Sequence, residues 1–192
     1  MQLPLTRDVR RILDFDIENR PSSYWYDGQT TAEVTAIAWA FTDKPKDISV
    51  RVLDPDDSLS MENMLYDFLN AYDEAYMVTG HYIRKHDLPI LNGAIIENGF
   101  LPLSPKMTSD TKLDLIRYSD QPKTQEYLGR LMDTKASKVH MDQADWREAN
   151  RLTPEGLAKT KKRVIGDVRQ HIQLRAALIE RGMLTKPKLW KP

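Results

Sequence analysis

A chain of 192 residues has room for one ordinary globular domain, and its 41% hydrophobic content is enough for a core and too high for a disordered chain. The 28 Lys and Arg residues are balanced by 28 Asp and Glu residues, which excludes a histone-like polybasic protein and leaves only local basic surfaces for nucleic acid. The chain has no cysteine, so disulfides, thiolate metal sites and cysteine nucleophiles are excluded.

The sequence contains no long apolar segment. A charged residue appears as early as Arg7, unlike in a secretory signal peptide, and no stretch approaches the roughly 18 apolar residues of a membrane helix. We therefore expect a soluble, intracellular, cytoplasmic protein with no membrane partner. Because no repeat or low-complexity linker divides the chain, residues 1–192 are predicted to form a single domain.

The first part of the chain predicts three strands and a helix. Apolar and acidic residues alternate over residues 11–18, as in a half-buried strand. A loop is expected over residues 19–29, where Pro, Ser and Gly occur, and further strands over residues 34–41 and 48–53. Ser60 is expected to cap the helix that follows.

The second part of the chain alternates strands and helices. Residues 77–82 predict a short strand and residues 88–98 a helix. Thr153 and Pro154 are typical of an N-cap and a first helical position, and the long amphipathic helix that they begin is expected to end at Gly182. Early strands followed by alternating helices and strands predict an α/β domain with a mixed sheet.

Asp16 and Glu18 are the first candidates for chemistry. Side chains two residues apart on a strand point to the same face, so both carboxylates can bind one metal site. Mg²⁺ and Mn²⁺ prefer such oxygen ligands. The alternative is a solvated strand face, because acid-x-acid pairs also arise by chance in a chain this acidic. Asp14 shares the face of Asp16, and we expect it to be exposed or to support the site without binding the metal.

Two later acids are the remaining candidates. Asp87 lies between a predicted strand and a helix, where it can reach the end of the first strand; the alternative role is that of a helix N-cap. Asp167 lies beside the apolar stripe of the long helix, with Arg163 and His171 one turn away on either side. The alternative for these three residues is a surface pairing worth a few tenths of a kcal/mol.

Together, these segments resemble the DEDD superfamily of 3′–5′ exonucleases, whose ribonuclease-H-like fold includes polymerase proofreading domains. Residues 15–18 (Phe-Asp-Ile-Glu) match the first motif of the family, residues 79–89 are similar to the second, and residues 166–168 (Gly-Asp-Val) resemble the third. The resemblance spans residues 11–182 and implies a mixed five-stranded sheet flanked by helices. Small stand-alone members of this length include proteins carried by bacteriophages, and such a member would work in the host cytoplasm.

The resemblance also implies a site and a reaction. The four metal-binding acids of the family correspond to Asp16, Glu18, Asp87 and Asp167, which would hold two ions of Mg²⁺ or Mn²⁺. Two such ions about 4 Å apart stabilise the attacking and leaving oxygens of a phosphodiester. The implied activity is two-metal-ion hydrolysis of phosphodiester bonds at the 3′ ends of single-stranded DNA.

Two positions depart from the family pattern. The family has a Tyr four residues, or a His five residues, before the last Asp, where it orients or deprotonates the attacking water; here these positions hold Arg163 and Lys162. Arginine cannot act as a general base, but it can donate hydrogen bonds to a phosphate or to the water, so Arg163 is a catalytic candidate. His171 is the alternative replacement. Tyr82 stands where the second motif commonly has Asn, which affects a supporting contact.

Basic and aromatic residues close to the motifs are candidates for binding a strand. A basic rim beside the acids would hold the phosphate backbone, and three consecutive aromatic residues in the predicted loop would stack on unpaired bases. The alternatives are solvated helix faces and packing of the aromatic rings onto the protein body. The candidates are Arg84, Lys85, Lys162, Arg163, Tyr24, Trp25 and Tyr26.

Three alternatives to a DNA exonuclease stay open. An RNA-directed exonuclease would use the same carboxylates, since nothing in the sequence reports on 2′-hydroxyl recognition. A structure-specific endonuclease of the same fold would also share them. The third is a catalytically weak or inactive module that binds nucleic acid or a replication partner, as the substitution at Arg163 suggests. The presence of all four acids favours an enzyme, because a scaffold has no physical need to concentrate them.

Overall fold

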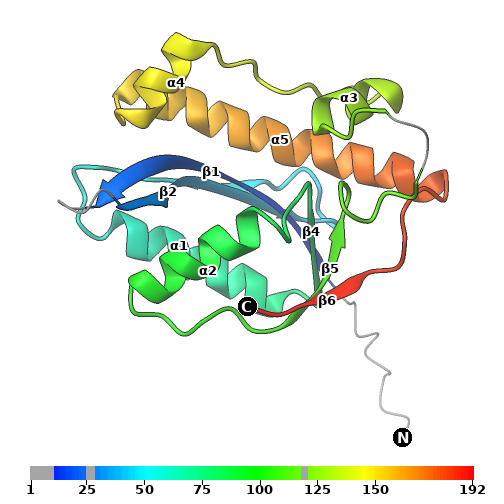
Figure 1. Ribbon diagram of the computed structural model, residues 1–192, viewed down its shortest axis with the longest axis horizontal. Coiled ribbons are helices and arrows are strands. Elements are labelled where there is room, and N and C mark those ends of the chain that lie inside the picture. Colours follow the sequence, from blue (N-terminus) through cyan, green and yellow to red (C-terminus); the bar gives the residue numbers. More distant parts are fainter. Residues whose placement is uncertain (1–10, 25–28, 118–120) are drawn as a thin grey trace, which may run out of the picture.

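The computed structural model describes residues 11–24, 29–117 and 121–192, and over these residues the chain forms a mixed sheet in the strand order β3-β2-β1-β4-β5-β6 (Figure 1). The strands are β1 (Ile12–Tyr24), β2 (Gln29–Phe41), β3 (Ser49–Val52), β4 (Met77–Gly80), β5 (Lys106–Asp110) and β6 (Lys188–Trp190). β1, β4 and β5 run parallel, whereas β2, β3 and β6 are antiparallel to their neighbours. The carboxyl ends of the parallel strands therefore lie at one edge of the sheet, which is where α/β sheets place their ligands.

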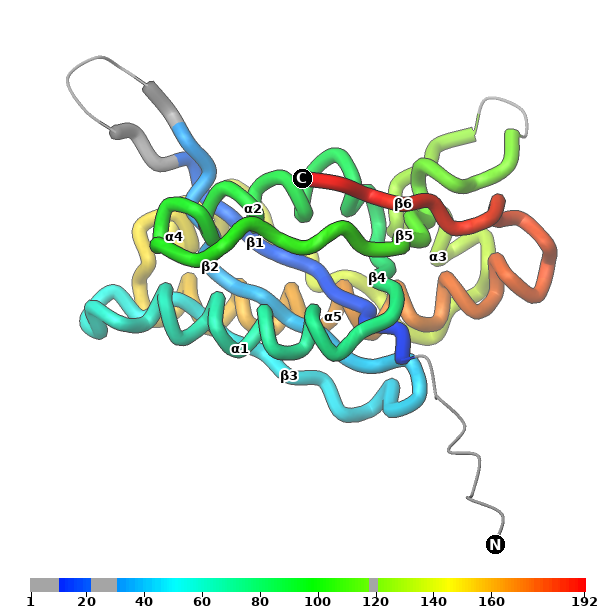
Figure 2. The backbone as a smooth tube through the Cα atoms, turned by 90° about the horizontal axis from the view of Figure 1, so that it is seen from below, coloured from blue at the N-terminus to red at the C-terminus, as the bar shows by residue number. Residues whose placement is uncertain are grey.

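Helices cover both faces of the sheet. One face packs against α1 (Ser60–Glu74) and α2 (Asp87–Glu97), and the other packs against the long α5 (Pro154–Glu180). Figure 2 shows α1 and α2 in front of the strands and α5 behind them. The short helices α3 (Gln125–Leu131) and α4 (Gln143–Asn150) pack on α5.

The alternation of residues along β1 decides what each face of the sheet contains. Leu13, Phe15 and Ile17 are buried in the core beneath α1 and α2. The acids between them face α5, and their partners on β2 in the antiparallel register are Ala36, Ala38 and Ala40. Val164 and Val168 of α5 pack on these alanines. Small side chains on β2 let α5 approach the sheet closely, which brings the acids of β1 and α5 together.

The ends of α5 are as predicted. The Thr153 hydroxyl accepts a hydrogen bond from the Gly156 amide at 3.1 Å, Pro154 is the first helical residue, and Gly182 has a φ of 64° just after the helix. Gly156 is required by a close approach, because a Cβ there would lie 2.3 Å from the carbonyl oxygen of Glu148 in α4. The start of α5 is therefore fixed against α4.

A loop is predicted over residues 19–29, but residues 19–24 instead belong to β1, which ends at Tyr24, and residue 29 begins β2; residues 25–28 lie outside the described residues. Arg20 pairs with Glu33 across the two strands. Pro21 is tolerated because this end of β1 pairs only with β2, and proline is accepted on an edge strand.

The prediction that Ser60 caps α1 is also wrong. Leu59 is the N-cap, and the Ser60 hydroxyl instead accepts a hydrogen bond from the Asp54 amide at 2.8 Å.

The sheet has one strand more than the five predicted, since β6 pairs with β5. Among the described residues, no helix is both long enough and apolar enough to cross a membrane.

Candidate functional site

Three of the four predicted acids meet on the side of the sheet that faces α5. Carboxylate oxygens of Asp16, Glu18 and Asp167 all lie within 4.8 Å of one another. Asp16 and Glu18 come from β1 and Asp167 comes from α5, so strand alternation and helix packing assemble the cluster jointly. Oδ1 of Asp167 is buried and has no hydrogen-bond partner in the structure. An oxygen-only ligand set with an unpartnered buried oxygen fits a divalent cation such as Mg²⁺ or Mn²⁺.

Asp87, the fourth predicted acid, borders this cluster. It is the first residue of α2, and its Oδ1 accepts a hydrogen bond from the amide of Ile17 at 3.3 Å. Ile17 lies between Asp16 and Glu18 in the sequence, so the hydrogen bond ties the start of α2 to the acidic part of β1. The alternative role as an N-cap is wrong, because His86 occupies that position.

Gly80 lets the loop that leads to Asp87 pass against β1. A Cβ at Gly80 would lie 2.7 Å from the carbonyl oxygen of Phe15 and 2.3 Å from Cγ2 of Ile83. On β1 itself, the pairing with β2 has an irregularity between Glu18 and Asn19, immediately after the two acids. Such a bulge changes the direction of a strand next to a site, and it ends the regular alternation at Glu18.

Two basic side chains contact the acids. Nζ of Lys138 lies 2.9 Å from Oδ2 of Asp167, and Nε of Arg163 donates a hydrogen bond to Oε1 of Glu18 at 2.7 Å. The guanidinium of Arg163 is 5.0 Å from the centre of the Trp146 ring. Sequence reasoning missed Lys138, because it lies in a segment between α3 and α4 that carries no motif. The two cations partly neutralise the cluster.

Burial and mutual repulsion raise the pKa values of these acids. For Asp16, burial raises the pKa well above its usual value, and the charges of Asp87, Asp167 and Glu18 add to the effect. Burial also raises the pKa of Glu18 to about 7, although Arg163 acts in the opposite direction. The cluster therefore lacks positive charge even with Lys138 and Arg163 present, and bound divalent ions would supply it.

We expect the metal-free protein to lose stability as the pH rises toward neutrality. Glu18 ionises near pH 4.5 in an unfolded chain and near pH 7 in the folded one, so between these values the folded state binds more protons and the free energy of unfolding falls with pH. In the presence of a chelator, the Tm should fall by several degrees from about pH 5 to about pH 8. Added Mn²⁺ should remove most of this fall. Glu18→Gln is the control and should show a weaker pH dependence in chelator; an unchanged dependence would contradict the expectation.

His171 is buried behind the acids and does not face them. Its Nδ1 lies 2.7 Å from Oδ2 of Asp14, and its Nε2 lies 3.0 Å from the hydroxyl of Thr111, which is also 2.9 Å from Nδ1 of His81. Both ring nitrogens are therefore engaged, and neither is left to orient a water molecule. Of the two places expected for Asp14, the structure excludes the exposed one, because its carboxylate is fully buried and fixes α5 to β1 through His171.

The predicted basic rim is only partly present. Arg84 is wrongly placed on it, because its guanidinium donates two hydrogen bonds, at 2.8 and 2.6 Å, to the fully buried carboxylate of Asp114. A buried carboxylate needs such a partner, so Arg84 serves the fold. Lys85 and Lys162 are exposed, as expected of residues that meet a phosphate backbone.

The aromatic residues predicted to stack on bases cannot be placed at the site. Tyr24 is the last residue of β1, and Trp25 and Tyr26 lie outside the described residues. Their role in binding a strand stays a prediction.

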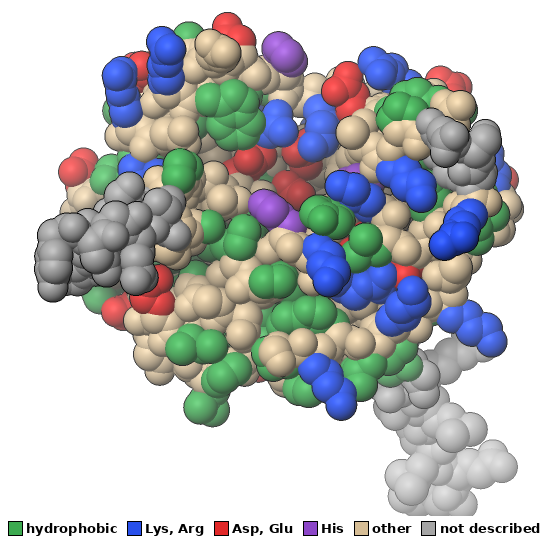
Figure 3. Space-filling view, viewed as in Figure 1, with side chains coloured by type: hydrophobic (Ala, Val, Ile, Leu, Met, Phe, Trp, Pro, Cys, Tyr) green, Lys and Arg blue, Asp and Glu red, His purple; other side chains and the backbone are tan. Residues whose placement is uncertain are grey.

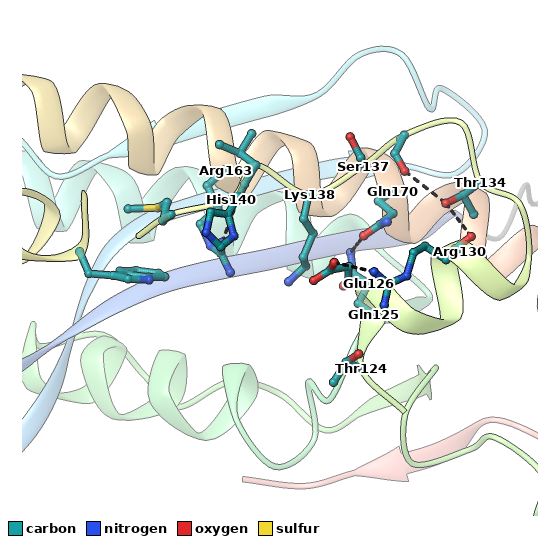
Figure 4. Close-up of a pocket in the computed structure, with 15 residues that line it drawn as sticks. Thr124, Gln125, Glu126, Arg130, Thr134, Ser137, Lys138, His140, Arg163 and Gln170 are labelled. Atoms are coloured by element: carbon teal, nitrogen blue, oxygen red, sulfur yellow. Dashed lines mark hydrogen bonds and ion pairs between the residues drawn. The ribbon is translucent and has the colours of Figure 1, made fainter. Parts of the chain in front are cut away.

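A cavity of about 460 Å³ opens beside the acids, between α3, α4, α5 and residues 134–141 (Figure 4). Lys138 and Arg163 line this cavity and also contact the acidic cluster. Arg130, His140 and Trp146 line it too. In Figure 3, acidic side chains lie in a hollow at the middle of one face, and Lys and Arg side chains gather around it. The cavity is within the roughly 300–1,000 Å³ of small-molecule sites, so it has room for a nucleotide next to the acids.

Comparison with known proteins supports the fold. No family model and no curated protein matches the sequence. Among solved structures, the chain is similar to the family B DNA polymerase from the hyperthermophilic archaeon Pyrobaculum calidifontis, with a TM-score of 0.62 and 18% identity. The match covers 88% of this chain and 24% of the polymerase chain, so this chain spans about a quarter of that protein's length. The protein thus has a ribonuclease-H-like α/β fold, with a buried acidic cluster that could bind metal.

Proposed function

We propose that this protein is a two-metal-ion 3′–5′ exonuclease that hydrolyses phosphodiester bonds at the 3′ ends of single-stranded DNA. The observation that carries the proposal is the convergence of Asp16, Glu18 and Asp167 to within 4.8 Å, with Asp87 at their border. The resemblance of the sequence motifs to DEDD exonucleases and the structural similarity to part of a DNA polymerase support it. Fold alone would not, because one fold hosts many functions.

Each residue of the cluster has a role in this reaction. When bound, Mg²⁺ or Mn²⁺ ions would supply a water of lowered pKa and positive charge at the departing 3′ oxygen. Asp16, Glu18 and Asp167 would hold the ions, and Asp87 would complete the ligand set from the start of α2. Arg163 stands where the family has its Tyr, and it donates hydrogen bonds to a phosphate oxygen or to the attacking water without removing a proton.

The surroundings of the acids favour a single strand as the substrate. The formal net charge of zero supplies little of the phosphate neutralisation on which sequence-independent duplex binding rests. The cavity beside the acids has the size of a site for one nucleotide, and Lys138 and Arg163 line the side where it meets the cluster. A frayed or unpaired 3′ end can enter such a site, whereas the stacked interior of a duplex cannot.

The test follows a 5′-labelled single strand of DNA in Mg²⁺ or Mn²⁺. We expect a ladder of products that shorten from the 3′ end, which chelator abolishes and which Asp16→Ala does not produce. The matched control is Asp67→Asn, since Asp67 is a surface acid paired with Arg51, and it should cleave like the wild type. Early internal cuts would favour the endonuclease, and faster cleavage of an RNA strand would favour the RNA-directed enzyme. Binding of the strand without cleavage in either metal would overturn the proposal.

A further inference from the structure

Tyr82, in the loop between β4 and α2, has an unusual backbone conformation. Its φ is 73°, in the left-handed region that bulky residues rarely adopt and Asn adopts more readily. The fully buried carboxylate of Asp110 holds this loop, because it accepts hydrogen bonds from the amides of Tyr82 at 3.0 Å and Arg84 at 3.1 Å. Such strain persists where the surroundings enforce it, and it is concentrated at functional sites.

The ring of Tyr82 forms a pair with a lysine that lies just after the next strand, β5. Nζ of Lys112 lies 3.7 Å from the centre of the ring, within the range of a cation–π interaction. The amide of Lys112 donates a hydrogen bond to Oδ1 of Asp110 at 3.0 Å. The same buried carboxylate therefore fixes both members of the pair. Both side chains are half-buried, so each keeps some surface open to solvent.

The pair lies at the edge of the sheet that carries the acids. Tyr82 follows β4 and Lys112 follows β5, and both strands end at this edge. The loop that contains Tyr82 leads directly into Asp87, which is bonded to Ile17. Thr111, next to Lys112, contacts His171 of α5, one turn after Asp167. The cavity lies on the side of the acids formed by α3, α4 and α5, whereas Tyr82 and Lys112 lie in the loops that follow β4 and β5.

We propose that Tyr82 and Lys112 form a binding site for one nucleotide of a single-stranded nucleic acid, in which the Tyr82 ring stacks on the base and the Lys112 ammonium contacts a neighbouring phosphate. The inference rests on the proposed function, because it concerns the strand whose scissile phosphate reaches the acids. A base stacks on any aromatic face, so this contact does not depend on sequence. Because Asp110 holds the loop rigid, little conformational entropy is lost when the strand binds.

The experiment measures the affinity of the full chain for a short 5′-fluorescein oligodeoxythymidine in Ca²⁺, with a gel to show that the strand stays intact. Tyr82→Asn removes the ring and keeps a residue that accepts the left-handed conformation; it should bind about tenfold more weakly. Tyr82→Phe keeps the ring and should bind like the wild type. The Tm of Tyr82→Asn should equal or exceed that of the wild type, because the strain is relieved. Lys112→Met should reduce the slope of log affinity against log salt by about 0.7.

A strand with one abasic nucleotide separates stacking from packing. A series of strands carries the abasic nucleotide at a different position in each. Wild-type binding should weaken for the strand in which the missing base is the one near the 3′ end that stacks on Tyr82. Tyr82→Asn should bind that strand and the intact strand equally well. Wild-type affinity in a stable Tyr82→Asn protein, or equal losses in Tyr82→Asn and Tyr82→Phe, would overturn the inference. If the wild type binds the strand with these signatures but cleaves nothing in Mg²⁺ or Mn²⁺, the proposed function fails and this binding site stands. If it cleaves normally and Tyr82→Asn binds normally, only this binding site fails.

Discussion

Asp167→Asn is expected to reduce cleavage of single-stranded DNA by about 10³-fold or more at saturating Mn²⁺, because a ligand that places a catalytic ion contributes several kcal/mol to transition-state stabilisation. The fold should survive the change. The Asp167 side chain is buried and its pKa is raised mainly by burial, so a neutral amide of the same shape suits the site without metal. Asp87→Asn should cause a loss of similar size, although Asp87 lies at the border of the cluster.

The two variants need a measurement that separates lost catalysis from lost structure. Thermal unfolding in chelator should give a Tm for each that is equal to or above the wild-type value near pH 8, and calorimetry should show weaker binding of Mn²⁺. Asp67→Asn again serves as the matched control and should change neither quantity. Cleavage by Asp167→Asn within a few-fold of the wild type would show that this cluster does not hold the catalytic ions.

Asp114→Ala is expected to lower the free energy of unfolding by about 3–5 kcal/mol, which corresponds to a fall in Tm of roughly 10 °C for a chain of this length. The carboxylate of Asp114 accepts two hydrogen bonds from Arg84 and one from the Asp110 amide at 2.9 Å. Arg84 opposes the effect of burial and holds the pKa of Asp114 below its usual value. Removing the carboxylate would leave the charge of Arg84, whose side chain is only 11% exposed, without its carboxylate partner.

The surface pair Arg51–Asp67 provides the comparison for Asp114→Ala. Asp67→Ala should cost less than about 1 kcal/mol, as is usual for an exposed ion pair. Arg84→Met should destabilise the protein as Asp114→Ala does, and the two changes together should cost less than the sum of both. If Arg84→Met left the stability unchanged and weakened only the binding of DNA, the original assignment of Arg84 to the basic rim would be restored.

Local patterns were enough to predict the fold class and to select the acids. Strict alternation along β1 places Asp16 and Glu18 on one face, and the apolar stripe of α5 places Asp167 beside that face. Neither pattern predicts the distance between β1 and α5. That distance depends on the alanines of β2, which are small enough for α5 to pack closely. The sequence therefore identified the acids as candidates, whereas the close packing of α5 on the sheet brings their carboxylates within reach of one another.

Charged residues whose partners are distant in sequence were the least predictable part of the site. Arg84 precedes Asp87 and looked like part of a basic rim, but its partner Asp114 lies beyond β5. His171 is one helical turn from Asp167, yet it bonds to Asp14 on β1. Lys138 has no local pattern at all and still contacts Asp167. A single sequence shows local neighbours, whereas these contacts depend on how distant segments pack.

The division of the acids between β1 and α5 also has a consequence during synthesis on the ribosome. Domains fold from the N-terminal side as the chain emerges, so the hairpin that carries Asp16 and Glu18 is made long before α5 delivers Asp167. Until α5 packs on Ala36, Ala38 and Ala40, the nascent sheet has one uncovered face and an incomplete acidic cluster. The step that completes the hydrophobic packing is thus the step that completes the acidic cluster, and an unfinished chain near messenger RNA carries only part of that cluster.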